Sequence, residues 1–263
     1  MIRMVHMLRR APGLSRQDFA AMWRDTNGPL IASFQTDLDI VRYLQVHPDP
    51  ADQGLDAVAS EARGGMMPPF DGVAEYWWKS AGALRAALST GVGGSAAKQL
   101  VVSERRFVDL PASPLWFATE FPQVATTLSR QVARNRSNLM RLHFALQPRK
   151  ELGEAEARHY WLDEHGPLIR SHSLARGLLA YNQVHRCDCR LLAAFTADRG
   201  TTAEPFLGHA ESWFERPSGD RPSFEMQAAM DAAIEDEQKF IDWSASTILV
   251  GKELVFVDRE WAL

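Results

Sequence analysis

One segment of ten residues occurs twice in this chain. Residues 22–31 read Met-Trp-Arg-Asp-Thr-Asn-Gly-Pro-Leu-Ile, and residues 160–169 read Tyr-Trp-Leu-Asp-Glu-His-Gly-Pro-Leu-Ile. Trp161 follows Trp23 at an offset of 138 positions (161 − 23). A repeat of this length means that each copy must be one folding unit, which constrains the fold more than any other feature of the sequence.

The duplication extends over nearly the whole chain. Beyond the repeated segment, the matched pairs include Tyr43 with Tyr181, Gln45 with Gln183, Gly72 with Gly208, and Phe107 with Phe240. At the front of the copies we align His6 with His143, an offset of 137 (143 − 6). We therefore expect two domains, 1–121 and 138–263, joined by a linker at 122–137. A length of 263 residues suits two ordinary domains.

Hydrophobic patterning predicts the same six elements in each copy, in the order strand, helix, strand, strand, helix, strand. Ser15 is predicted to cap the first helix, and Gly28-Pro29 is predicted to bend that helix without ending it. In the first copy the predicted strands are 2–8, 40–47, 73–79 and 115–121, with helices after Ser15 and over 82–108. In the second copy they are 139–146, 178–185, 209–214 and 247–257, with helices from 154 and over 224–242. The segments 48–71 and 186–207 are predicted to be long loops.

This order predicts an α+β fold made of two ferredoxin-like (βαββαβ) repeats, each with both helices on one face of its sheet. The strands are apolar on both sides, so the second face of each sheet must also be covered. We expect the two sheets to pack against each other and to form one barrel within the chain. The protein would then be a monomer with an internal pseudo-dimer, or a homodimer.

Composition limits the classes of partner. A net charge of −4 without a basic stripe argues against nucleic acid as a partner. The longest apolar runs are far shorter than a membrane span, so no membrane association is predicted. Arg3, Arg9 and Arg10 interrupt the first apolar stretch, and the only cysteines are Cys187 and Cys189. We therefore expect no signal peptide and a cytoplasmic location.

The motifs resemble those of the EthD family, in the dimeric α/β-barrel superfamily. They are a Trp followed by Asn-Gly-Pro-Leu or His-Gly-Pro-Leu, Gly-x-Ala-Glu-x-Trp at residues 72 and 208, and Phe-(Val/Ile)-Asp before the last strand. The resemblance covers both copies and implies a tandem fusion that forms the barrel internally. It also implies an enzyme that needs no cofactor. Relatives include decarboxylases, dehydratases, cyclases and monooxygenases of aromatic or polyketide metabolism.

His165 is the leading candidate for catalysis, because an imidazole can act as acid or base near neutral pH. The first copy has Asn27 at the same place, so the second copy is expected to hold the working pocket. A structural role in bracing the bend is the alternative. Further catalytic candidates, expected within reach of His165, are His143, Glu211 and Tyr181. Candidate substrate-binding residues are Trp161, Trp213, Gln183, His6, Asn27, Tyr43, Glu75 and Trp77.

No metal site is assigned. His185, Cys187 and Cys189 alternate on one strand, but they lack a clear fourth ligand. The sequence also lacks a phosphate-binding loop or a nucleophile elbow. The predicted function is a cofactor-independent lyase, of the dehydratase or decarboxylase type, acting on a small hydrophobic aromatic or polyketide-like substrate. The alternatives are a cofactor-free monooxygenase and a non-catalytic protein that binds a hydrophobic metabolite.

Overall fold

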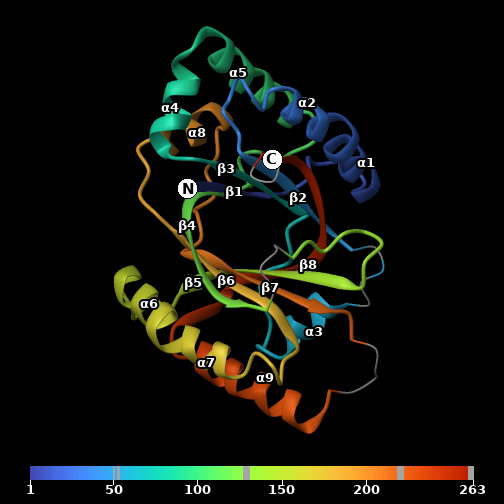
Figure 1. The fold of residues 1–263 in the computed structure, drawn as a ribbon, viewed down its shortest axis with the longest axis vertical. Coiled ribbons are helices and arrows are strands. Elements are labelled where there is room, and N and C mark those ends of the chain that lie inside the picture. Colours follow the sequence, from blue (N-terminus) through green and yellow to red (C-terminus); the bar gives the residue numbers. More distant parts are fainter. Residues whose placement is uncertain (50, 52–53, 127–130, 218–221, 260–263) are drawn as a thin grey trace.

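A computed structural model describes residues 1–49, 51, 54–126, 131–217 and 222–259. Within these residues eight antiparallel strands close into a barrel in the order β1-β3-β2-β8-β5-β7-β6-β4 (Figure 1). The strands of the first half are β1 (Ile2–Leu8), β2 (Arg42–Pro48), β3 (Gly72–Trp78) and β4 (Leu115–Ala125). Those of the second half are β5 (Leu139–Pro148), β6 (Leu178–Arg186), β7 (Gly208–Glu215) and β8 (Ile241–Asp258).

Each half contributes one ferredoxin-like sheet to the barrel. The sheet orders are β4-β1-β3-β2 and β8-β5-β7-β6, and the pairs β2–β8 and β4–β6 join the two sheets. The predicted α+β class and the intramolecular barrel are therefore confirmed. Helices cover the outside of both sheets, at opposite ends of the molecule (Figure 1). No helix within the described residues is long and apolar enough to cross a membrane.

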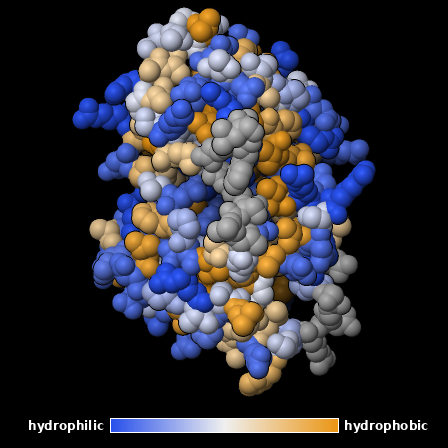
Figure 2. All heavy atoms as spheres, viewed as in Figure 1, coloured by the Kyte–Doolittle hydropathy of each residue, from blue (hydrophilic) through white to orange (hydrophobic). Residues whose placement is uncertain are grey.

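The helices follow the predicted order with several subdivisions. Those of the first half are α1 (Arg16–Ala21), η1 (Met22–Asn27), α2 (Gly28–Ser33), α3 (Leu55–Glu61), α4 (Ala81–Ser89) and α5 (Gly91–Glu104). Those of the second half are α6 (Glu154–Tyr160), η2 (Trp161–His165), α7 (Gly166–Ser171), α8 (Leu192–Arg199) and α9 (Phe224–Glu237). The face shown in Figure 2 is mostly hydrophilic at its periphery, and hydrophobic residues form a band near its middle.

The repeated segment forms a π-helical turn, η1 or η2, that runs directly into α2 or α7. Gly28-Pro29 therefore lies within a continuous helical path, as predicted, since proline fits the first turn of a helix. Ser15 caps α1 by accepting a hydrogen bond from the Asp18 amide at 3.0 Å. The cap predicted from the sequence is present.

The matched residues brace helix against strand in both halves. Gln45 Nε2 donates to the Trp23 carbonyl at 2.9 Å, and Gln183 Nε2 donates to the Trp161 carbonyl at 2.7 Å. The ring of His185 stacks on Trp161 at 4.2 Å between centroids. His47 and Trp23 lie at the same separation in the first half, which shows the pseudo-twofold relation of the halves.

Alternate residues on each strand face either the barrel interior or the helices. On β1, Val5 and Met7 belong to the barrel core, whereas Met4 and Leu8 pack under the helices. All seven β1 residues are buried, because both faces of the strand are covered. His6 shares the helix-facing side of the strand with Met4 and Leu8.

This geometry corrects the alignment of His6 with His143. Val5 pairs with Glu75 across β1 and β3, and His143 pairs with Glu211 across β5 and β7. The true equivalent of His143 is therefore Val5, at the offset of 138 that also relates Trp23 to Trp161. A shift of one residue moves a strand side chain to the opposite face. His6 faces the helices, and His143 faces the barrel interior.

The two predicted long loops each contain a helix that covers the other half. From the first half, Leu55 of α3 packs against the second-half core. Phe195 of α8, from the second half, packs against Phe117 of the first half at 5.5 Å between ring centroids. Figure 1 shows α8 beside α4 and α5, and α3 on the side of α9. At the predicted linker, β4 continues to Ala125, and residues 127–130 lie outside the described residues.

Candidate active site

An apolar cleft of about 240 Å³ lies between the first-half sheet and its helices. Most of its lining side chains are aliphatic or aromatic and come from β1, β3, α4, α5 and α8. The second half therefore contributes one wall, α8, to a cleft in the first half. Its lining includes Met4, Tyr76, Trp78, Ala97, Phe195 and Arg199.

Four polar side chains, Tyr76, Lys98, Asp198 and Arg199, interrupt this apolar lining, and of these only Tyr76 and Arg199 are buried. Arg199 Nε lies 2.8 Å from Glu104 Oε2, and both side chains are buried. Burial raises the pKa of the Tyr76 hydroxyl well above its usual value, with Tyr43 and Glu104 nearby adding to the shift. Tyr76 is therefore a neutral hydrogen-bond donor, and Arg199 is a fixed positive charge.

His6 lies on the same face of β1 as Met4 and is 1% exposed. Neither ring nitrogen makes a hydrogen bond. Burial, together with the positive charge of Arg199, lowers the pKa of His6 well below its usual value. The imidazole is therefore neutral.

The second half has no equivalent of the His6 imidazole or the Tyr76 hydroxyl. At the positions equivalent to His6 and Tyr76, β5 and β7 carry Phe144 and Ser212. The buried Arg–Glu pair is nevertheless repeated, because Arg63 Nε lies 2.7 Å from Glu237 Oε2. The first half therefore has an imidazole and a phenol on the helix-facing side of its sheet, and the second half has neither at the equivalent positions.

His165 lies in the helical layer of the second half, where its Nδ1 is 2.8 Å from Asp236 Oδ2. Although burial opposes it, hydrogen bonds from His165, Tyr160 and Lys239 hold the pKa of Asp236 well below its usual value. In the first half the equivalent contact is from Asn27 Nδ2 to Ser103 Oγ, at 3.2 Å. The second half therefore has an imidazole–carboxylate pair where the first half has an amide and a hydroxyl.

The structure does not bring the predicted catalytic group together. His165 packs on Phe240 under α9, whereas His143 and Glu211 point into the barrel interior. His165 lines neither of the two cavities described here. The other predicted site residues that lie outside both linings are Trp161, Gln183, Tyr181, Tyr43, Asn27, His143, Glu75 and His6.

A second cavity, of about 260 Å³, opens from the barrel interior and is lined by both charged and apolar side chains. Trp77, Trp213 and Glu211 line it together with Arg3 and Arg141. Arg3 lies over the Trp77 ring at 4.5 Å, and Arg141 lies over the Trp213 ring at 5.0 Å. Glu75 and Glu211 each form ion pairs with both arginines.

Several of these residues were not predicted from the sequence. Arg3 and Arg141 were detectable, because they repeat at the offset of 138. Glu104 and Arg199 were not, because 95 positions separate them and only the crossing of α8 brings them together. His185 stacks on Trp161, and the partly buried Cys187 and Cys189 pack beside the first-half core.

The fold and the arrangement of the halves define an internally duplicated dimeric α/β barrel. The EthD domain model matches residues 11–111 and 149–244. The chain belongs to the EthD family, with one domain in each half. The search of curated proteins gave no match.

Three solved structures share the overall arrangement at low sequence identity. One is a proposed monooxygenase from Lactobacillus acidophilus, with 9% identity, a TM-score of 0.46, and coverage of 98% of this chain and 96% of that chain. Another is a proposed monooxygenase from Fusobacterium nucleatum, with 6% identity, a TM-score of 0.48, and coverage of 97% and 93%. The third is a proposed chlorite dismutase, with 12% identity, a TM-score of 0.45, and coverage of 96% and 94%. At such low identity, these three structures do not indicate the activity of this chain.

Proposed function

We propose that the protein is an enzyme that binds a small hydrophobic metabolite in the first-half cleft and catalyses a lyase reaction there by proton transfer. The observation that carries this proposal is the composition of the cleft. Its walls are mostly apolar, with the buried Tyr76 and Arg199 inside and the exposed Lys98 and Asp198 also in the lining. Few, well-placed polar groups in an apolar cavity are typical of small-molecule sites. An aromatic or polyketide-like compound with one carbonyl or carboxylate group suits this lining.

Arg199, Tyr76 and His6 have complementary roles in this proposal. Arg199 stabilises the negative charge that develops on the substrate oxygen, and the Tyr76 hydroxyl donates a hydrogen bond to that oxygen. His6, which burial keeps neutral and which lies outside the cleft lining on the same face of β1 as Met4, is assigned the role of accepting the substrate proton through one bridging water. In the loss of water from a β-hydroxy carbonyl compound, the proton passes from the α-carbon to His6 and then from His6 to the departing β-hydroxyl oxygen, which leaves as water.

A cofactor-free monooxygenation in the same cleft is the second candidate reaction. It is favoured by the apolar walls, which would keep water away from a substrate carbanion before it meets dioxygen.

The imidazole–carboxylate pair of His165 and Asp236 keeps His165 as a second candidate for the proton-transferring residue. A carboxylate at Nδ1 fixes the tautomer and leaves Nε2 as the reactive nitrogen.

The site of binding is tested with a matched pair of variants. Ala97 lines the cleft, and Met230 on α9 is its equivalent in the second half (230 − 97 = 133). Ala97→Trp fills the cleft and should abolish binding of 2-naphthoate in calorimetric titrations, whereas Met230→Trp should bind it as the unmodified protein does. The opposite pattern would place the binding site in the second half.

The reaction is tested by mass spectrometry on aromatic and polyketide-like carboxylic acids and β-hydroxy carbonyl compounds. Each compound is incubated with the protein in air and under nitrogen. Loss of water or carbon dioxide under both conditions supports the lyase. Gain of oxygen only in air supports the monooxygenase. Binding without turnover of any compound supports a binding protein.

A further inference from the structure

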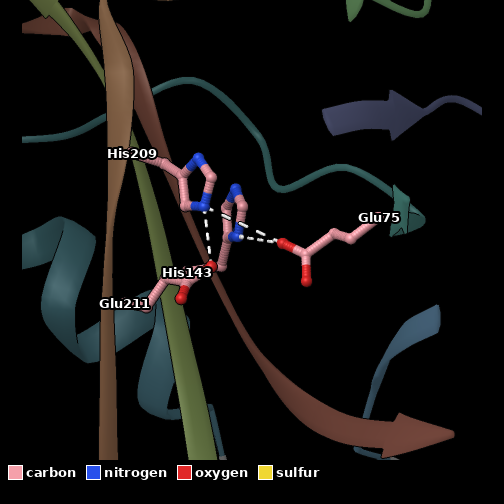
Figure 3. A group of neighbouring side chains, drawn as sticks. All are labelled: Glu75, His143, His209 and Glu211. Carbon is pink, nitrogen blue, oxygen red and sulfur yellow. Dashed lines mark hydrogen bonds and ion pairs between the residues drawn. The ribbon is translucent and has the colours of Figure 1, made fainter. Parts of the chain in front are cut away.

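The barrel interior contains a buried group of two histidines and two glutamates, separate from the cleft. His143, His209 and Glu211 come from the second half, and Glu75 comes from the first (Figure 3). One ligand atom from each residue lies within 4.8 Å of the others. Glu75 points into the barrel while its neighbour Tyr76 points to the cleft, so the two sites occupy opposite faces of β3.

From this group we infer a site for one divalent transition-metal ion inside the barrel. Imidazole nitrogens and carboxylate oxygens are ordinary ligands of Zn²⁺ and Co²⁺. The group appears in no linear motif, because its members lie on three strands of two halves.

The duplicated chain supplies an internal control for this inference. The equivalents of His143 and His209 in the first half are Val5 and Val73, which lie in the same barrel core. The barrel can therefore be filled at these positions by two valines. Two buried imidazoles replace them in the second half, although burying a polar side chain without a partner is unfavourable.

His143 is the clearest sign of a missing ligand. It is fully buried, and neither ring nitrogen makes a hydrogen bond. Its Nδ1 lies 3.9 Å from Glu75 Oε1, beyond hydrogen-bond distance. Glu75 Oε2 and His209 Nδ1 are also buried without a hydrogen bond. His209 Nε2, which faces the group, hydrogen-bonds to Glu211 Oε1 at 2.8 Å, and Glu75 Oε1 is bound by both arginines. The fully unpaired ring of His143 therefore carries the inference of a partner that the protein itself does not provide.

The local charge is consistent with a cation. Within the described residues, ion pairs connect Arg3 and Arg141 to four carboxylates, those of Glu75, Glu120, Glu211 and Glu253. The four carboxylates outnumber the two guanidinium groups in this largely buried network, so a cation between them would offset the excess of acidic groups. The arginines hold the carboxylates in place, as outer hydrogen-bond partners of metal ligands commonly do.

The arrangement needs only local adjustment to bind an ion. Metal–ligand distances near 2.1 Å require the ligand atoms to move inward by up to about 0.8 Å. His143 and His209 are stacked with centroids 3.9 Å apart and planes 17° apart, so one ring must tilt for both nitrogens to face the ion. The cavity of about 260 Å³, which Glu211 lines, provides a path of entry from solvent.

The direct test is a titration of chelator-treated full-length protein with Co²⁺, followed by visible absorption, and with Zn²⁺, followed by equilibrium dialysis and elemental analysis. We expect one ion per chain. The double variant His143→Val/His209→Val, which copies the first half, should lose binding while circular dichroism and urea unfolding show a folded protein. Should that variant fail to fold, Glu75→Gln serves instead and should weaken binding at least about tenfold.

A control excludes the other soft ligands of the chain. Cys187→Ser/Cys189→Ser should bind Co²⁺ with unchanged affinity and an absorption spectrum free of thiolate bands. The inference is overturned if the unmodified protein binds neither ion more tightly than the millimolar range. It is equally overturned if the valine double variant still binds one ion with unchanged affinity.

Discussion

Arg199 Nε, in the second half of the chain, lies 2.8 Å from Glu104 Oε2 in the first half. The pair connects α8 to α5 at the cleft, and Arg63 with Glu237 repeats it in the opposite sense. Each half therefore supplies a helix and a buried arginine to the other. A substrate in the first-half cleft would contact both halves of the duplicated chain.

Breaking the Arg199–Glu104 pair should be strongly destabilising. Arg199→Met leaves the Glu104 carboxylate buried without its cation, and such a change typically costs about 3–5 kcal/mol. Urea unfolding should show this loss, and Arg199→Met/Glu104→Leu should recover most of it. Arg63→Met is the matched variant in the second half and should behave similarly. A loss below about 1 kcal/mol would mean that the pair acts as an exposed one.

The fold could be predicted because the repeat fixed both the element order and the number of halves. Apolar residues on both faces of strands such as β1 then required a closed barrel. The face of each β1 residue was not predictable from the alignment, since His6 and His143 match well at an offset that is wrong by one. Only the pairing of Val5 with Glu75 and of His143 with Glu211 decides the register.

The site was predicted less well than the fold. His165 differs from Asn27 in the repeated segment, so the sequence drew attention to the second half. The cleft instead depends on α8, whose packing on the first half no local pattern indicates. Tyr76 and Ser212 also differ between the copies, but a strand residue gains significance only when its facing cavity is known.

Acid should destabilise the protein partly through His185. Burial, with a contribution from Arg158, lowers the pKa of His185 to about 4. In the unfolded chain His185 binds a proton as the pH falls below about 6.5, whereas in the folded protein it stays neutral down to about pH 4. The free energy of unfolding therefore decreases as the pH drops from about 6.5 to about 4. The loss from this residue is at most about 3 kcal/mol. His185→Phe, which keeps an aromatic ring against Trp161, should flatten the pH dependence of the urea midpoint across this window. An unchanged slope would show that His185 does not contribute.

The two halves should remain associated after the connection between them is cut. A protease site inserted between Thr126 and Gln131 separates β4 from β5 in sequence, but the pairs β2–β8 and β4–β6 still join the sheets. The cleaved protein should elute as one species in size-exclusion chromatography, without denaturant. Separation into two fragments would contradict a barrel core shared by both halves.

The assignment of the working half is tested most directly by comparing His6→Asn with His165→Asn. Both variants remove one buried imidazole, and His165→Asn introduces the residue that the first half already has at Asn27. With a substrate identified by the mass-spectrometric screen, His6→Asn should lower kcat by about 10²–10⁴-fold, the usual contribution of a general base, while substrate still binds. His165→Asn should retain nearly full kcat. The reverse result, with His165→Asn inactive and His6→Asn unimpaired, would contradict this account and place catalysis at the His165–Asp236 pair.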